Sequence, residues 1–450
     1  MRNAIPRRAR VVIAAGTVAL AGVALSACTG GQPDTSASGG TTEISWWAYG
    51  PDVSVVDQYL AAFNEEHPDI KVNFKLISQD TYDAVLRPAL ASNSGPDVFT
   101  EDPGARFEQF QSYGTDLTPA FEDALGSDWS SQLAQIGVDA FTKDGKLMAA
   151  PVGGDFAGTI WINQDLFTEY GQTPPTTFDE WVDVCAAFRS HDVGCFVQGA
   201  QQTDFDQDMF QAIADTIEPG LYSEAVAGDA AWDDPQLVQA FQAWGDTFTN
   251  GIMQDGALGI TQFPDANNEF LAGKYAMVMM GTWYMQNTRT DILTAGMTAA
   301  GNTGAPFVAV PIQFPAAVEG GTPGGLFGNS GGGLAVSAKS AHKEAATTFA
   351  TWLATAPAGQ QVVADLMVNT PSLKGITPDF AALGLVAPDV QQPKIEWMID
   401  EASKVTETRK LVDPDLEQAL GTALTTIAAG DASPAQAAAT LQQTAESLRG

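Results

Sequence analysis

The sequence predicts an α/β protein of two or more lobes, built on mostly parallel sheets flanked by helices. Segments whose apolar residues alternate, as in strands, are separated by segments whose apolar residues recur at helical spacing. The first strands and helices are expected at 43–49, 55–63, 70–76, 80–92 and 97–100. This βαβαβ order is typical of parallel strands joined by crossover helices. A chain of 450 residues also exceeds what one hydrophobic core usually supports.

The same alternation restarts after Pro151, which predicts the second lobe. Further strands are expected at 159–162, 196–197, 276–280, 307–310 and 334–337, helices at 177–189, 206–217 and 235–250, and a Gly-rich loop at 320–333. From residue 341 to the end the pattern is almost wholly helical. Ligands of doubly wound sheets bind beyond the carboxyl ends of the strands. The residues that follow 43–49 and 97–100 are therefore candidates for a binding site.

The charge balance excludes some partners. The chain has 21 Lys and Arg against 54 Asp and Glu, a formal net charge of -33. Such a surface repels nucleic acid and anionic membranes, so we expect no nucleic-acid partner. Because 45% of the residues are hydrophobic, the chain is expected to fold around a large core.

The first 28 residues have the layout of a secretory signal. Four arginines lie within the first ten residues, an apolar run covers 11–25, and Leu25-Ser26-Ala27-Cys28 follows. This ending resembles the lipobox of bacterial lipoproteins, which implies cleavage after residues 1–27 and acylation of Cys28. Residues 28–42 would then be a lipidated flexible tether, and the protein would sit outside the cytoplasmic membrane, anchored to its outer face. An ordinary signal peptide or an uncleaved anchor is the alternative, and the export route, Sec or twin-arginine, is open.

Cys185 and Cys195 are the two remaining cysteines. Cys185 lies in a predicted helix and Cys195 at the start of the next strand, so the two sulfur atoms can come together. In an oxidising compartment we expect a disulfide between them, and two buried thiols are the alternative.

A series of short signatures follows along the chain. They are Trp46-Trp47, Phe63-Asn64-Glu65-Glu66-His67-Pro68, Ser94-Gly95-Pro96-Asp97-Val98, Lys146-Leu147-Met148-Ala149-Ala150-Pro151, Ile160-Trp161-Ile162-Asn163-Gln164-Asp165-Leu166-Phe167 and Gly281-Thr282-Trp283. In this order they resemble the family 1 extracellular solute-binding proteins, the sugar-capturing subunits of bacterial ABC importers. The resemblance covers essentially the whole chain after the leader.

The resemblance implies the two-lobed periplasmic-binding-protein fold of type II, with a helical C-terminal region. It places 43–151 plus 311–356 in the N-terminal lobe and 152–310 plus 357–450 in the C-terminal lobe. By similarity the chain crosses between lobes near Val152, Val310-Pro311 and Ala356-Pro357. A carbohydrate, a neutral oligosaccharide or a monosaccharide, would be enclosed between the lobes by hinge closure and delivered to a membrane permease pair driven by a separate ATPase. We expect a monomer.

A sugar presents hydroxyl groups and apolar C–H faces, so its site needs carboxylates, amides and aromatic rings. Strand ends, the Gly-rich loop and the resemblance nominate ten ligand-binding residues: Trp47, Tyr49, Glu101, Asp102, Asp155, Asp204, Asp206, Trp283, Phe327 and Asn329. Trp46 and Trp47 point to opposite faces of their strand, and we favour Trp47 for the cleft. The resemblance makes Trp283 a stacking platform. The alternatives are core packing for the aromatic residues and solvated loops for the carboxylates.

Sequence features of catalysis are weak. Gly328-Asn329-Ser330-Gly331-Gly332 matches G-x-S-x-G, but a Gly-rich loop precedes it and a strand follows, which is the wrong context for a nucleophile elbow. The chain has three histidines and no zinc-binding spacing. We therefore expect no catalytic residue, metal or cofactor. A secreted glycosidase that uses paired carboxylates beside tryptophans is the rival interpretation.

Overall fold

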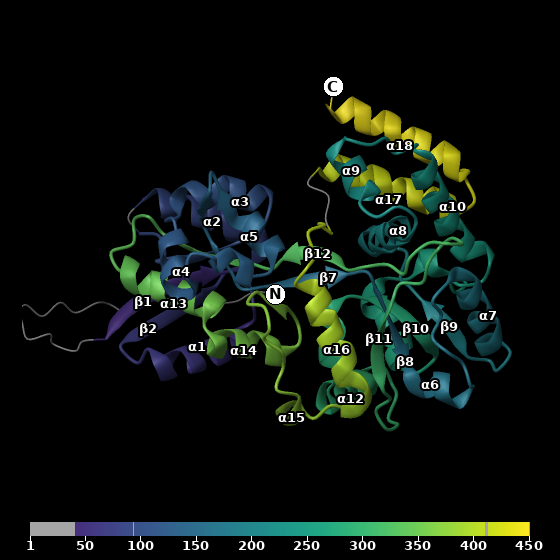
Figure 1. Ribbon diagram of the computed structural model, residues 1–450, viewed down its shortest axis with the longest axis horizontal. Coiled ribbons are helices and arrows are strands. Elements are labelled where there is room, and N and C mark those ends of the chain that lie inside the picture. Colours follow the sequence, from purple (N-terminus) through teal and green to yellow (C-terminus); the bar gives the residue numbers. More distant parts are fainter. Residues whose placement is uncertain (1–40, 93, 410–412, 450) are drawn as a thin grey trace, which may run out of the picture. The chain divides into compact units, whose positions relative to one another are not determined.

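The computed structural model describes residues 41–92, 94–409 and 413–449 (Figure 1). The predicted leader, 1–27, and Cys28 lie outside the described residues, as does nearly all of the predicted tether. Within the described residues the fold is α/β, as predicted, with helices packed around two main sheets.

The first sheet has five strands in the order β2-β1-β3-β13-β6. These are β2 Ile70–Leu76, β1 Thr42–Ala48, β3 Val98–Glu101, β13 Gly333–Val336 and β6 Ala150–Pro151. The first three are parallel, with Thr42 opposite Ile70 and Trp46 opposite Val98. Strand β13 runs antiparallel to β3 and to β6, between which it lies. The parallel part matches the predicted βαβαβ unit.

Helices cover the first sheet because each presents an apolar stripe to it. They are α1 Val53–Glu66, α2 Gln79–Ala91, α3 Ala105–Phe110, α4 Thr118–Leu125, α5 Gln135–Phe141, α13 Lys343–Thr355 and α14 Pro357–Leu366. Trp46, on the strand face that also carries Ile44 and Ala48, packs against Phe349 of α13 with ring centroids 5.5 Å apart. The late helices α13 and α14 therefore belong to the core of the first sheet.

The second sheet has four strands in the order β11-β8-β10-β9. These are β11 Ala309–Gln313, β8 Thr159–Asn163, β10 Tyr275–Met280 and β9 Gly194–Val197. Alternate residues of β8 and β10 enter two different cores: Ile160 and Met277 lie in one, Trp161 and Val278 in the other. Because both faces are buried, β10 is a continuous apolar run and not an alternating one.

The helices around the second sheet come from the middle and the end of the chain. They are α6 Gln164–Glu169, α7 Phe178–Arg189, α8 Thr203–Ile217, α9 Leu221–Ala227, α10 Pro235–Thr249, α11 Asn267–Leu271, α12 Thr290–Ala299, α15 Phe380–Leu383, α16 Pro388–Ala402, α17 Pro414–Ala428 and α18 Pro434–Arg449. Helix α7 begins where the sequence predicted, with the Thr177 side chain accepting a hydrogen bond from the Glu180 N–H. Helices α17 and α18 pack on α8 and α10 (Figure 1).

A third sheet, β12-β7-β14, is formed by short strands. Along the chain, β7 and β12 each lie between a strand of one main sheet and a strand of the other. They are β12 Phe327–Ser330, β7 Gly153–Ala157 and β14 Thr370–Pro371. Strand β7 follows β6 of the first sheet and precedes β8 of the second, and it pairs antiparallel with both neighbours. We describe β12, β7 and β14 below as the crossing sheet. The domain boundaries drawn from the sequence stay a prediction.

Two expectations about the sheets need correction. Both main sheets are mixed, not mostly parallel, because β13 and β8 run antiparallel to their neighbours. Strand β13 comes from a distant part of the chain and is not linked to β3 by a βαβ crossover. It can therefore run antiparallel to β3. The Gly-rich loop expected at 320–333 contains strand β12, because its glycines allow the backbone to lie close to β7.

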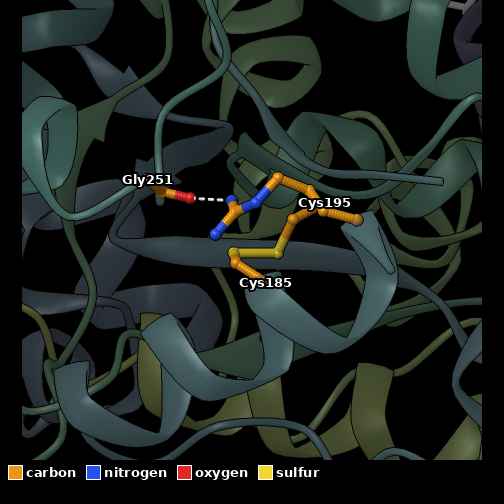
Figure 2. Close-up of a disulfide and its surroundings, with 4 residues drawn as sticks. Cys185, Cys195 and Gly251 are labelled. Atoms are coloured by element: carbon orange, nitrogen blue, oxygen red, sulfur yellow. Dashed lines mark hydrogen bonds between the residues drawn. A yellow bond between two sulfur atoms is a disulfide. The ribbon is translucent and has the colours of Figure 1, made fainter. Parts of the chain in front are cut away.

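Cys185 of α7 and Cys195 of β9 form a disulfide with Cα atoms 4.9 Å apart (Figure 2). Beside it, the Arg189 side chain donates a hydrogen bond to the Gly251 carbonyl, shown as the dashed line in Figure 2. This pairing agrees with the predicted one. None of the helices in the described part of the chain combines the length and the apolar run that a membrane crossing requires.

Candidate functional site

A cavity of about 670 Å³ lies at the carboxyl ends of β1 and β3 and beside the crossing sheet. Its polar border consists of Gln79, Thr100, Asp102, Asp155, Asn329, Ser330, Asn369 and Thr408. Its apolar border includes Trp46, Tyr49, Pro51, Tyr59 and Leu334. Asp102 and Asp155 are the only charged side chains among the described residues that border it. The cavity therefore offers hydrogen-bond acceptors, amides, hydroxyls and aromatic surface.

One wall of the cavity is organised by Arg106 of α3. Its guanidinium pairs with Asp102 and with Asp83, 2.8 Å from Asp83 Oδ1, and lies 4.5 Å from the centre of the Tyr49 ring. The Tyr49 hydroxyl donates to Asp102. Burial and the nearby Asp102 carboxylate raise the pKa of Tyr49, so this phenol stays protonated and remains a donor. Tyr49 and Asp102 are thus brought together, as predicted from the strand ends.

A second wall contains Asp155 of β7 and Asn329 of β12, which are register partners across the crossing sheet. Both border the cavity. Arg409 approaches Asp155, with 3.4 Å between Nη1 and Oδ2, and makes a two-pronged pair with Asp208 of α8 at 2.8 and 2.7 Å. The Asp155 side chain is 33% exposed and that of Asp208 only 4%. The carboxylate nearer the cavity is therefore the more accessible of the two.

Trp283 does not border this cavity. It lies in the turn after β10, where its ring folds over Gly281 so closely that a Cβ there would meet the indole at 2.2 Å. The Arg409 guanidinium covers the ring at 4.5 Å from the centroid. The predicted role of Trp283 as a platform stays a prediction, and its ring is occupied by an arginine in this structure.

Two of the predicted carboxylates are buried outside the cavity border. Glu101 is 0% exposed, and neither of its carboxylate oxygens has a hydrogen-bond partner among the described residues. Burial raises the pKa of Glu101 well above its usual range, opposed by the charge of Arg106. Asp206 is also 0% exposed, and Gln198 donates to its Oδ1 at 2.9 Å. Burial likewise raises the pKa of Asp206.

The structure does not bring the other predicted residues to the cavity border. Trp47 carries the Lys75 ammonium 4.0 Å from its ring centre, whereas Trp46, on the other strand face, borders the cavity. Phe327 is 1% exposed and packs in a core of the second sheet. Asp204 lies exposed in the first turn of α8. That Trp47, Phe327 and Asp204 contact the ligand stays a prediction.

Sequence reasoning missed Arg106, Asp208 and Arg409. Arg106 follows Asp102 by four residues, so the rule for ion pairs one helical turn apart could have found it. Asp208 and Arg409 are separated by 201 positions and carry no local signal. They are brought together by the pairing of the 407–409 segment with β12 and by the hydrogen bond from the Gln211 side chain of α8 to the Thr408 carbonyl.

A larger hollow, about 930 Å³, is lined by α4, α13 and the start of α14. It lies away from the carboxyl ends of β1 and β3, and no arginine–carboxylate pair borders it. We place the candidate site at the smaller cavity because aromatic rings, carboxylates and amides converge there.

The structure has mixed α/β sheets and a cavity at the strand ends that is bordered by the crossing sheet. This is the two-lobed periplasmic-binding-protein fold of type II. The comparisons with known proteins then identify the family. Residues 47–360 match the family of bacterial extracellular solute-binding proteins, and the chain belongs to that family. The resemblance drawn from the signatures is therefore confirmed.

Curated relatives are distant. The xylose/arabinose-binding protein XacG of Haloferax volcanii is 24% identical over 253 residues, which is 54% of this chain and 54% of that protein. The melibiose/raffinose/stachyose-binding protein MelE of Bacillus subtilis is 26% identical over 138 residues, 30% of each chain. The chain thus spans about half the length of the first of these relatives and less of the second.

Solved structures share the fold over nearly the full chain. Maltose-bound MalE3 of T. maritima has a TM-score of 0.66 and 18% identity, covering 91% of this chain and 100% of that one. An ABC substrate-binding protein from Listeria monocytogenes in complex with cycloalternan has a TM-score of 0.65 and 20% identity, covering 91% and 99%. At these identities the likeness extends to the fold alone.

Proposed function

We propose that this protein is the substrate-binding lipoprotein of an ABC importer that captures a carbohydrate and delivers it to the membrane permease without chemical change. The observation that carries the proposal is the cavity at the carboxyl ends of β1 and β3. Its border combines two carboxylates, two asparagine amides and the Tyr49 ring, the groups that sugar hydroxyls and C–H faces require.

The similar proteins support a sugar as the ligand. One relative is named for xylose and arabinose, another for melibiose, raffinose and stachyose, and one structural neighbour holds maltose. The cavity charge supports an uncharged sugar, because both charged border residues are carboxylates and would repel a uronate or a sugar phosphate.

The location outside the cell is a proposal of its own. We propose that the chain is cleaved before Cys28 and acylated there, and that the anchored protein works as a monomer beside the permease. The Cys185–Cys195 pairing supports an oxidising compartment. Labelled palmitate is expected to enter the wild type and not Cys28→Ala; equal labelling of both would refute the anchor.

Binding is tested with the soluble protein from residue 41 onward, titrated with D-xylose, L-arabinose, maltose and raffinose. A sugar that binds only the folded state stabilises it by about 2.7 kcal/mol at 100 times the dissociation constant, so the melting temperature rises with sugar concentration. Calorimetry should give one saturable site. If none of the four sugars raises the melting temperature, the proposal is contradicted for these sugars.

The site is tested with Asn329→Ala, which should weaken binding several-fold because the amide borders the cavity. Asn73→Ala is the matched control, since Asn73 is exposed on β2 and pairs with Glu43. Trp283→Ala is also expected to weaken binding several-fold, through contact with the sugar or through support of Arg409. Equal affinity of Asn329→Ala and Asn73→Ala would place the site elsewhere.

The glycosidase interpretation has a direct test. Overnight incubation of the protein with maltose or raffinose should leave the sugar intact, as judged by mass spectrometry. Release of monosaccharides in proportion to protein concentration would replace the binding-protein proposal with an enzyme.

A further inference from the structure

Arg409 holds an unusual position between the crossing sheet and helix α8. Its backbone N–H donates to the Gly328 carbonyl at 3.2 Å, and the Gly328 N–H donates to the Glu407 carbonyl at 2.9 Å. These bonds fix the 407–409 segment beside β12, which in turn pairs with β7. The backbone of Arg409 is thus held by the strand that lies next to the one carrying Asp155.

The Arg409 side chain contacts two carboxylates and two aromatic rings, of which the Phe205 ring is the more distant, 5.8 Å from the guanidinium. It makes the two-pronged pair with Asp208, approaches Asp155 and lies over the Trp283 ring. The side chain is only 12% exposed. A planar guanidinium suits this combination, because its fork matches one carboxylate, its remaining nitrogen reaches a second, and its face stacks on an indole.

The charges around Arg409 decide what it can bind. Asp155 of β7 and Asp204 and Asp208 of α8 all act on it electrostatically, and Asp208 also acts on the buried Asp206 carboxylate. Within the described part of the chain, the Arg409 guanidinium thus faces several acidic groups. An arginine compensated in this way is a poor receptor for an anionic ligand, but it is well suited to holding carboxylates in place.

The first wall repeats the arrangement independently. Arg106 pairs with Asp102 at the cavity border and with Asp83 outside it, and it stacks on Tyr49. In each wall the arginine itself does not border the cavity. It contacts one carboxylate that borders the cavity, a second carboxylate and an aromatic ring. This repetition indicates a common role in setting the border carboxylate.

We propose that Arg409 is a positioning residue for carbohydrate binding, which holds the Asp155 carboxylate at the cavity border as an acceptor for sugar hydroxyls. This inference rests on the proposed function. It also assigns the covered face of Trp283 to Arg409 and not to the sugar. Removal of the guanidinium would then weaken binding, whereas an arginine that merely blocked Trp283 would give tighter binding when removed.

The first experiment needs no sugar. Carbodiimide footprinting with mass spectrometry compares labelling of Asp155 in the wild type, Arg409→Gln and Arg409→Lys, with Asp102 as the internal reference. Loss of the guanidinium should raise Asp155 labelling several-fold in Arg409→Gln, with Arg409→Lys in between, while Asp102 stays unchanged. Arg289→Gln, which removes an arginine from the exposed pair with Asp291, is the matched control. Unchanged labelling of Asp155, or an equal rise at Asp102, overturns the proposal.

The second experiment measures affinity against pH for whichever of D-xylose, L-arabinose, maltose and raffinose stabilises the wild type most. Arg409→Gln should bind at least tenfold more weakly at pH 7. Without the guanidinium and with Asp208 nearby, Asp155 should protonate at higher pH, so the acid side of the binding profile should move upward. A general structural defect would lower affinity equally at every pH.

The outcomes separate the two proposals. Tighter binding by Arg409→Gln, or an unshifted pH profile, overturns the role of Arg409 while leaving sugar binding intact. If the wild type binds none of the four sugars, the proposed function fails for this set, and the footprint still decides whether Arg409 holds Asp155.

Discussion

Glu101 offers a quantitative test of the electrostatics behind the cavity. It lies at the end of β3, is fully buried, and its two carboxylate oxygens have no partner among the described residues. Replacing it with glutamine keeps the shape of the side chain and removes the ionisable proton. The variant Glu101→Gln therefore isolates the cost of carrying a titratable group at this position.

The direction of the effect follows from proton linkage. Burial raises the pKa of Glu101 in the folded state, so between its ordinary value of 4.5 and that raised pKa the folded protein binds more protons than the unfolded chain. The free energy of unfolding of the wild type must then fall as pH rises through this window. Below pH 4.5 both states are protonated and the penalty is absent. Each pH unit inside the window costs about 1.4 kcal/mol.

The assay is urea unfolding of the protein from residue 41 onward at pH 4 and at pH 7. Glu101→Gln should match the wild type within about 1 kcal/mol at pH 4 and should be more stable than the wild type at pH 7, the difference growing by about 1.4 kcal/mol for each pH unit inside the window. Glu122→Gln is the control, because Glu122 is exposed on α4 and should shift neither value. A difference between Glu101→Gln and the wild type that is the same at both pH values would refute the reasoning.

Two further predictions concern stability. The double variant Cys185→Ser/Cys195→Ser opens a loop with a sequence separation of 10 and should lose about 2 to 3 kcal/mol in urea unfolding, with no further loss on adding reductant. An unchanged unfolding midpoint would show that the disulfide does not form. Gly328→Ala would place a Cβ 2.4 Å from the Asp155 carbonyl oxygen and should cost about 1 to 3 kcal/mol, whereas Gly325→Ala, with no atom within 4 Å, should be nearly neutral. Equal calorimetric melting temperatures of the two glycine variants would contradict the close approach of β12 to β7.

Local patterns predicted much of the fold. Strand β2 begins and ends where its alternating residues indicated, and β1, β3 and β10 agree within one residue. Period and turn signals are sufficient there because each element forms its own hydrogen bonds or pairs with a neighbour in the chain. Strand β12 was missed because Gly328 and the glycines that flank the strand lower strand propensity, and pairing with β7 and with the distant 407–409 segment stabilises the extended conformation.

The candidate site was predicted only in part. Four predicted residues border the cavity: Tyr49, Asp102, Asp155 and Asn329. Strand ends and the Gly-rich segment lie at the cavity, so their position in the chain was enough to predict them. The choice between Trp46 and Trp47 needed knowledge of which strand face is buried, and Trp46 shares the core face with Ile44. Asp208 and Arg409 lie 201 positions apart, so no local pattern could have indicated that pair.

The position of β13 has a consequence for the order in which the chain can fold during synthesis. This strand lies between β3 and β6, yet it is made from residues 333–336, more than 180 residues after β6. A nascent chain that ends before Gly333 leaves one edge of β3 and one edge of β6 without their partner, so the first sheet cannot close while most of the polypeptide is being made. The first sheet is therefore completed only after residues 333–336 have been synthesised, when most of the chain has already been made.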